Sequence, residues 1–310
     1  MIGKHRLVYI DEAQRIPSIG LTLKIIADRM KEVQLLVGGS SAFDQGNEIN
    51  GPLTGRKSEY LLLPVSRQEW QESMGYLKAG QQLEQRLIYG MYPEVLTHPG
   101  EETELLRELA SGNLYKDILA LSGIKKPEIF EKGLQALALQ LGGEVSYNER
   151  AQSVGADENT VSHYIEVLEK AFIIFRLPAF GGNIRNEIRT NRKVYVYDNG
   201  IRNAVIRNYA PLALRQDKGA LWENFILSER VKRNRNMRLD ASSYFRRNVQ
   251  QQEIDYVETV DGQVSAFEIK WDPKRRAKLP ASFKNAYDVD LHIGHRDNFR
   301  DFICGPPGII

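Results

Sequence analysis

The stretch EIDYVETVDGQVSAFEIKW, residues 253–271, decides the fold of the C-terminal part of this chain. Its two β-prone runs flank Asp261-Gly262, a dipeptide that favours a two-residue hairpin turn. Because side chains alternate between the two faces of a strand, Glu268 and Lys270 share one face, and the apolar residues beside them take the other. The sequence therefore predicts a hairpin that buries an aromatic face and presents a carboxylate and an ammonium together.

Asp255, on the first strand of this hairpin, adds a second acid to the pattern. An acid followed on the next strand by acid-x-lysine resembles the active site of the PD-(D/E)xK nucleases. There, two carboxylates bind a divalent metal such as Mg²⁺ and the lysine positions the hydrolytic water. The resemblance implies Asp255 and Glu268 as metal ligands, Lys270 as a catalytic group, and Glu223 in a preceding helix as a further metal ligand. The alternative interpretation is a cross-strand ion pair without a catalytic role.

A second apolar run, LVYIDEAQ (Leu7–Gln14), leads directly into two adjacent acids. Helical periodicity follows over residues 19–32, and further strands are predicted at QLLVGGSSAF (34–43) and EYLLLPVS (59–66). This alternation is typical of a parallel α/β sheet, in which ligands bind beyond the carboxyl ends of the strands. That edge is predicted to carry Asp11, Glu12, Ser40 and Ser41.

These residue types suit phosphoryl transfer. Asp11 would hold Mg²⁺, and Glu12 would polarise the attacking water. Ser40 or Ser41 would sense the γ-phosphate of ATP, and Arg56 would act as an arginine finger toward a neighbouring subunit, which makes oligomerisation through this part an expectation. The alternatives are that Asp11 and the serines cap helices, and that Arg56 is a surface residue.

Three segments in order, LVYIDEAQ, LLVGGSSAF and GPLTGR with YLLLPVSRQEW, resemble the Walker B, sensor and post-sensor portions of the prokaryotic AAA-type ATP-binding proteins whose second half is a conserved domain of unknown function. The resemblance continues through NLYKDILALSGI, the helix-turn-helix, KVYVYDNGI, GALWENFIL and EIDYVE with FEIKW, so it covers nearly the whole chain. It implies ATP binding with Mg²⁺ and a phosphate loop of the form G-x-x-x-x-G-K-[ST]. The chain contains no such loop, since Gly3-Lys4 is followed by His5. We therefore expect an N-terminally incomplete ATP site that is not an efficient ATPase alone.

Residues from about 67 to 178 are predicted to be nearly all helix. Their last part has a helix, a glycine-containing turn after Val154 and a second helix capped by Asp157, followed by the candidate strands FIIFRL and KVYVYD. This order is typical of a winged helix-turn-helix, a fold that often binds DNA. Glu166 and Glu169 on the second helix would repel phosphates, so a structural or interdomain role is the alternative.

We predict an α/β fold class with three parts: a partial AAA ATPase domain with a P-loop NTPase-type parallel sheet (1–68), a helical, winged-helix-like region (69–180), and a nuclease-like mixed α/β domain (181–310). DNA or a partner protein is the expected partner, and a non-enzymatic adaptor is a further alternative. Basic runs at 183–193, 230–238 and 272–278 would suit nucleic acid, although solvated helix faces have the same composition.

Composition sets the remaining limits. The 310 residues are 42% hydrophobic and 26% charged, enough for two or three domains, and the net charge of +2 says little about a polyanionic partner. No apolar run approaches the roughly 20 residues that span a bilayer, and the first residues lack the apolar core of a signal peptide. We expect no membrane contact and a cytoplasmic location. The single cysteine, Cys304, excludes an internal disulfide.

Overall fold

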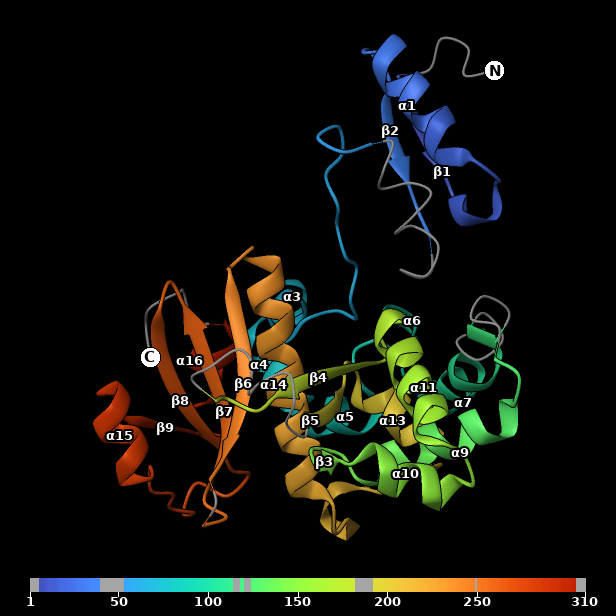
Figure 1. The fold of residues 1–310 in the computed structure, drawn as a ribbon. Helices are drawn as coiled ribbons and strands as arrows, with labels where there is room; N and C mark the ends of the chain where they lie inside the picture. The colour runs from blue at the N-terminus through green and yellow to red at the C-terminus, as the bar shows by residue number, and fades with distance from the viewer. Residues whose placement is uncertain are drawn as a thin grey trace.

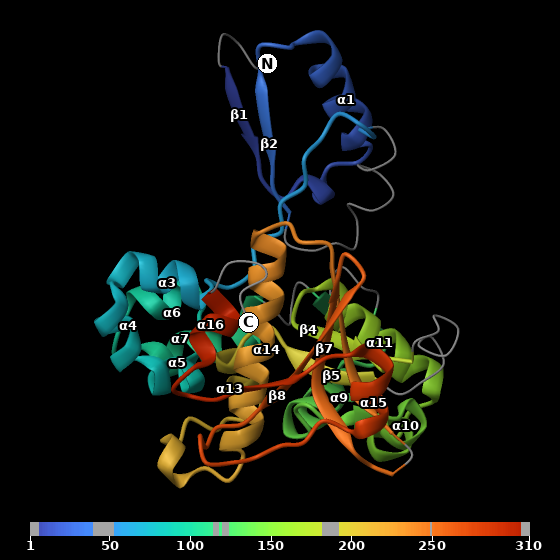
Figure 2. The same cartoon turned by 90° about the vertical axis from the view of Figure 1, so that its left-hand side faces the viewer.

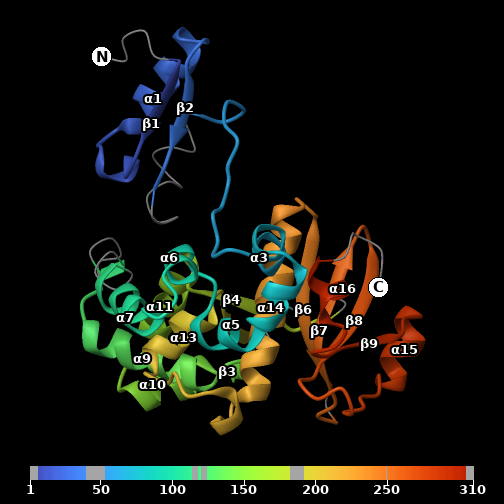
Figure 3. The same cartoon turned by 180° about the vertical axis from the view of Figure 1, so that it is seen from behind.

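The computed structural model describes residues 6–39, 53–113, 118–119, 124–181, 192–248 and 250–304. The chain forms a small N-terminal unit and a larger body, joined by an extended segment (Figure 1). The N-terminal unit stands beside the body and not within it in the views from the side and from behind as well (Figure 2, Figure 3). The core follows the same division, because one buried cluster lies in the N-terminal unit and another extends from Trp70 to Ile303.

The N-terminal unit is a two-stranded parallel sheet with one helix against one face. Its elements are β1 (Leu7–Ile10), the 3₁₀ turn η1 (Ala13–Arg15), α1 (Ile19–Arg29) and β2 (Gln34–Val37). The strands pair in register, with Leu7 opposite Gln34. The helix buries Ile19 and Leu23 against the sheet. The predicted strand–helix–strand order is confirmed.

The third predicted strand, at residues 59–66, is wrong. In the described part of the chain these residues pair with no other strand, and they run as the extended segment between the N-terminal unit and the body. Tyr60 and Leu62 are 74% and 94% exposed. The run is apolar and β-prone, but a strand also needs a neighbour with free backbone groups, and this segment leads away from β2 toward the first helix of the body.

The body begins with short helices and a helix-turn-helix. The helical elements are α3 (Arg67–Met74), α4 (Tyr76–Gln81), α5 (Leu83–Tyr89), α6 (Pro93–Thr97), α7 (Glu102–Glu108), the π-helical turn η2 (Leu109–Asn113), α9 (Pro127–Leu139), α10 (Tyr147–Val154) and α11 (Glu158–Lys170). Gly155 ends α10 in the left-handed conformation (φ 71°), and Asp157 caps α11 by accepting the Thr160 N–H at 3.0 Å. The predicted turn and cap are both present.

A three-stranded antiparallel sheet follows, in the order β3 (Glu144–Val145), β5 (Arg192–Val196) and β4 (Ile174–Pro178). The next elements are α13 (Asn199–Val205) and the turn η3 (Leu212–Leu214). Both β5 and α13 lie beyond the predicted domain boundary at residue 180. They nevertheless pair or pack with elements that precede residue 180. The three-stranded sheet therefore contains strands from both sides of the predicted boundary.

The C-terminal part is a four-stranded mixed sheet between helices. Its elements are α14 (Lys218–Asn236), β6 (Ala241–Arg247), β7 (Glu253–Val260), β8 (Gln263–Ile269), α15 (Ala281–Tyr287), β9 (Leu291–Gly294) and α16 (Phe299–Cys304). The strand order is β6-β7-β8-β9, antiparallel except that β9 runs parallel to β8. Asp261 and Gly262 both have positive φ (51° and 80°), as a two-residue turn of this kind requires. The predicted hairpin is confirmed.

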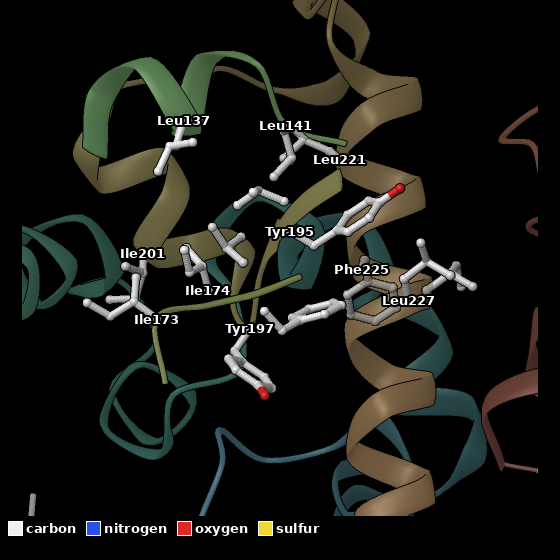
Figure 4. Packing of buried hydrophobic residues seen from close by; sticks show 14 of the residues in the cluster. Leu137, Leu141, Ile173, Ile174, Tyr195, Tyr197, Ile201, Leu221, Phe225 and Leu227 are labelled. Carbon is white, nitrogen blue, oxygen red and sulfur yellow. The ribbon is translucent and has the colours of Figure 1, made fainter. Parts of the chain in front are cut away.

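Helix α14 holds the body together. Its apolar side chains, among them Leu221, Phe225 and Leu227, meet β5 and the helices of the middle part in a single core (Figure 4). A bridge between Ala179 and Phe245 also ties β4 to β6. Among the described residues, no helix is both long and apolar enough to cross a membrane.

Asp198 caps α13, the helix that follows it, and its replacement tests that role. One carboxylate oxygen accepts the Ile201 N–H at 3.1 Å, and the other accepts the Met91 N–H at 2.6 Å, in a site where Asp198 is 4% exposed. We expect Asp198→Ala to lower the free energy of unfolding by about 2–4 kcal/mol, since it removes the helix cap and leaves the buried Met91 N–H without an acceptor. Urea unfolding measures this. Asp157→Ala, the same change at an exposed cap, should cost less; equal losses would contradict the account.

Candidate active site

The β7–β8 hairpin positions Asp255 where the backbone pairing of the two strands ends. Tyr256 and Phe267 form the last paired positions. Beyond them, the Asp255 carboxylate accepts the Ile269 N–H at 2.8 Å, so a side chain takes the place of the next backbone partner. Asp255 is only 5% exposed. The hairpin therefore holds this acid in place through its own strand and through the opposite one.

Lys270 joins the two acids of the predicted motif. Its Nζ lies 3.1 Å from Asp255 Oδ2 and 2.7 Å from Glu268 Oε1. Phe267 and Ile269 are buried at 1% and 3% exposure, as the alternation of the strand predicts. The structure thus brings together the three residues that sequence reasoning singled out on the hairpin.

Glu223 on α14 approaches this group from the other side. Its Oε1 accepts the Tyr195 hydroxyl at 2.6 Å and lies 3.7 Å from Lys193 Nζ. Lys193 also pairs with Glu253, at the start of β7. We call Lys193, Tyr195, Glu223, Glu253, Asp255, Glu268 and Lys270 the acid–lysine cluster; they come from β5, α14 and the hairpin.

Sequence reasoning missed Lys193 and Tyr195. A signal for them existed, because strand alternation puts Lys193 and Tyr195 on one face of β5. The alternation did not predict which element packs against that face. The contact with Glu223 depends on α14 packing across β5, which is a long-range event.

The cluster has more carboxylates than cations, and the pKa values reflect this. Burial, and then the nearby Asp255 charge, raise the pKa of Glu223 to about 7, against the opposing effects of Lys193 and the Tyr195 hydroxyl. Burial and Asp255 likewise raise the pKa of Glu268, although Lys270 opposes them. Burial disfavours the charged form of Lys270, but Asp255 and Glu268 outweigh it and raise the pKa of Lys270 above its ordinary value. The lysine therefore stays protonated.

The acid–lysine cluster is rich in carboxylate oxygens. Carboxylate oxygens are suitable ligands for Mg²⁺ or Mn²⁺. However, the described residues contain no group of three or more Asp, Glu, His or Cys side chains placed around a common point for a metal ion. The ammonium of Lys270 lies within hydrogen-bonding distance of both hairpin acids instead. As these side chains lie, they do not fit a bound metal.

The N-terminal acids lie at the end of β1, as predicted. Asp11 Oδ1 accepts the Tyr9 hydroxyl at 3.1 Å and the Glu12 N–H at 3.0 Å. Glu12 has a left-handed backbone (φ 48°) and pairs with Arg15 at 3.0 Å. Because β2 runs parallel to β1, both strands point their carboxyl ends toward this edge.

The remaining predicted nucleotide-site residues are only partly placed. Ser40 and Ser41 lie outside the described residues. Arg56 pairs with Asp28 of α1 at 2.7 Å, within its own chain. Gly38 is explained by packing, since a Cβ there would lie 2.8 Å from the Tyr9 hydroxyl oxygen. The role of each of these residues in nucleotide binding stays a prediction.

The comparisons with known proteins follow this division of the chain. Residues 1–71 match the family model of an AAA domain. Residues 80–212 match a domain of unknown function, DUF8612, and residues 218–300 match another, DUF4143. The N-terminal match assigns that part to an ATPase-like domain type, for which nucleotide binding with Mg²⁺ is the general property. The other two matches carry no function.

The similar curated proteins are themselves uncharacterized. The chain is 26% identical over 276 residues to one protein of Mycobacterium bovis and one of Mycobacterium tuberculosis, covering 86% of this chain and 59% of each relative. It is 22% identical over 288 residues to a protein of Haemophilus influenzae, covering 87% of this chain and 64% of that one. The chain therefore spans less than two thirds of the length of these relatives.

A solved structure is also similar at a low level. The crystal structure of protein VC1899 from Vibrio cholerae matches with 12% identity and a TM-score of 0.19, over 90% of this chain and 69% of that chain. A TM-score at this level does not establish a common fold.

The raised pKa of Glu223 predicts a pH dependence of stability. Between the ordinary value of 4.5 and about 7, the folded state holds a proton that the unfolded state releases. Raising the pH through this window should therefore destabilise the protein, by at most about 3 kcal/mol. We expect Glu223→Gln to remove this part of the slope, measured as the difference in the free energy of unfolding between wild type and variant at pH 4.5 and pH 8. Glu131→Gln, at an exposed position of α9, is the control, and an unchanged slope in Glu223→Gln would refute the assignment.

Proposed function

We propose that this chain is part of an AAA-type ATP-binding protein whose body engages DNA. One observation carries the first half of the proposal. Within the segment that matches an AAA domain, β1 ends on Asp11 and Glu12 beside the parallel strand β2. In parallel α/β sheets, this edge is where ligands bind.

The residues at the end of β1 suit a Mg²⁺–nucleotide. Hydrogen bonds among the described residues reach Oδ1 of Asp11, which leaves Oδ2 for a cation. Asp11 would hold Mg²⁺, whose charge neutralises the phosphates when it is bound. Glu12 would orient the attacking water, and Arg15 would hold Glu12 in place. Arg56 would have to leave Asp28 to reach a neighbouring subunit.

The phosphate-holding half of the site is a separate matter. No G-x-x-x-x-G-K-[ST] segment occurs in these 310 residues, and without backbone amides around the phosphates a magnesium ligand alone gives little rate enhancement. We infer that the phosphates are held by a segment that this chain does not contain.

This proposal predicts ATP turnover far below the range of the class. The purified chain should hydrolyse Mg²⁺–ATP at less than about 1% of the typical enzyme rate of roughly 10 per second, measured by phosphate release. Asp11→Ala should leave that residual rate unchanged, and Asp28→Ala is the matched control on α1. Turnover at a typical rate, abolished by Asp11→Ala, would contradict the proposal.

A second candidate function is hydrolysis of DNA by the acid–lysine cluster. The observation in its favour is that Glu223, Asp255, Glu268 and Lys270, all singled out by the acid-x-lysine pattern, meet in one place. The Lys270 side chain is 31% exposed, so it can contact a bound ligand while it still pairs with the buried acids. A protonated lysine there would attract a phosphate, and Glu223, with a pKa of about 7, could exchange a proton near neutral pH.

The helix-turn-helix contributes less to DNA binding than its order of elements suggests. Glu166 pairs with Lys170 at 2.7 Å, and Glu169 pairs with Arg176. The exposed side of α11 therefore carries neutralised pairs and no excess of positive charge. This favours a structural role for α11. It is also consistent with the third candidate function, a non-enzymatic adaptor.

The nuclease candidate makes a direct prediction. If it holds, the Lys270 ammonium would have to move away from Asp255 and Glu268 before Mg²⁺ or Mn²⁺ could bind them. Linear DNA should then be cut when either metal is added, and both Asp255→Asn and Lys270→Ala should reduce the rate at least about 100-fold, the usual effect of losing a catalytic group. Lys284→Ala, which removes an exposed lysine paired with Asp290, is the control. DNA that stays intact under both metals would leave binding without cleavage as the function of the body.

A further inference from the structure

Some cations of the basic run at residues 230–238 are buried in the interior, and the others are exposed. Arg230, Lys232 and Arg233 are 5%, 1% and 3% exposed. Arg230 donates to Glu258 at 2.5 and 3.0 Å, and Lys232 donates to Glu229 at 2.6 Å. Arg235 and Arg238 are the exposed members of the run. The positive charge that this run offers to solvent is therefore concentrated at the C-terminal end of α14.

Arg235 lines a cleft of about 400 Å³ between the two sheets of the body. One wall comes from the end of α11 and from β4, and the other comes from α14 and the start of β6. Three aromatic side chains face it: Phe172, Phe175 and Tyr197. The polar lining includes Arg176, Asn234 and Ser243. We call this space the β4–β6 cleft.

Phe172 occupies a backbone position that normally belongs to glycine. It follows α11 with φ of 55°, and its N–H bonds to Glu169 O at 3.0 Å, which ends the helix. A bulky residue with positive φ is strained, and such strain is often found at binding sites. Here the result is a half-buried aromatic ring on the wall of the cleft.

The cleft carries a net positive charge. Its acid, Glu169, pairs with Arg176, which also donates to the Tyr147 hydroxyl at 2.9 Å. Burial raises the pKa of Tyr197, and the Arg235 cation beside that hydroxyl opposes the rise. Arg235 is thus the cation in the lining with no carboxylate partner among the described residues, and three aromatic side chains line the same cleft.

We propose that the β4–β6 cleft binds a segment of single-stranded nucleic acid, with one base against Phe172 and a phosphate against Arg235. An aromatic platform beside an arginine is the usual means of holding a single strand without reading its sequence. A duplex offers no free base for such a platform. The inference rests on the proposed engagement of DNA and names the surface and the form of DNA involved.

The experiment uses the full chain and a fluorescein-labelled 20-nucleotide oligothymidylate, with binding followed by anisotropy. Arg235→Glu should weaken binding about tenfold, and Arg235→Ala should reduce the slope of log Kd against log salt by about one. Phe172→Gly should weaken binding at least about fivefold through lost stacking. Glycine suits the left-handed position, which offsets part of the packing against the core that is lost with the ring.

Arg275→Glu is the matched control, because it makes the same charge change at an exposed position of the other described basic run. It should leave the affinity within about twofold. Equal losses in Arg235→Glu and Arg275→Glu would mean general electrostatics and overturn the inference.

The remaining outcomes separate the inference from the proposed function. Binding by the wild type that survives both Arg235→Glu and Phe172→Gly would overturn the inference and leave DNA engagement standing. No binding of oligothymidylate by the wild type would overturn the inference, and failure to bind a labelled duplex as well would overturn the proposed engagement of DNA. Displacement by a polyglutamate of equal length, as effective as displacement by unlabelled oligothymidylate, would identify an acidic protein segment as the occupant and overturn the inference.

Discussion

The burial of α14 is the constraint on which the rest of the body depends. This helix carries acids, bases and an amide around its circumference, yet most of its residues are buried. A buried polar group that lacks a partner costs about 1–3 kcal/mol, so most of them bond within α14, as Lys232 does to Glu229, or to partners on other elements. Those partners come from three directions: Val196 of β5 for Asn224, Glu258 of β7 for Arg230, and the backbone of Arg67 for Glu229.

Both candidate sites of the body follow from this arrangement. Near its N-terminal end, α14 brings Glu223 against Tyr195 and the hairpin acids and so completes the acid–lysine cluster. Near its C-terminal end, it leaves Arg235 beside the β4–β6 cleft. Aromatic rings in contact connect the two sites, because the Phe175 ring centroid lies 5.6 Å from that of Tyr195, in a stacked pair, and 5.0 Å from that of Tyr197, in a tilted one. Both candidate sites of the body therefore lie along α14, next to the two sheets that this helix joins.

Prediction from sequence succeeded for features that depend on local pattern alone. It failed for features that depend on a strand or side chain from a distant part of the chain. The turn at Asp261-Gly262 needs only residues that tolerate positive φ, so the hairpin was predictable. The run at 59–66 is also apolar and β-prone, but no strand of the described part of the chain pairs with it. The basic run at 230–238 was interpreted as surface, and three of its five cations are inside. A charge can be buried when a carboxylate from a distant strand meets it, which no local pattern reveals.

By itself, the sequence determined which side chains could act together on one strand or at one strand end: Asp11 with Glu12, and Glu268 with Lys270. Alternation and turn chemistry are local properties, and they suffice for that. Only the tertiary structure decided which distant groups complete each site. Lys193 and Tyr195 reach Glu223, and Lys270 stands between two acids where a metal was expected, because packing α14 across β5 brings together charges that must neutralise one another once water is excluded.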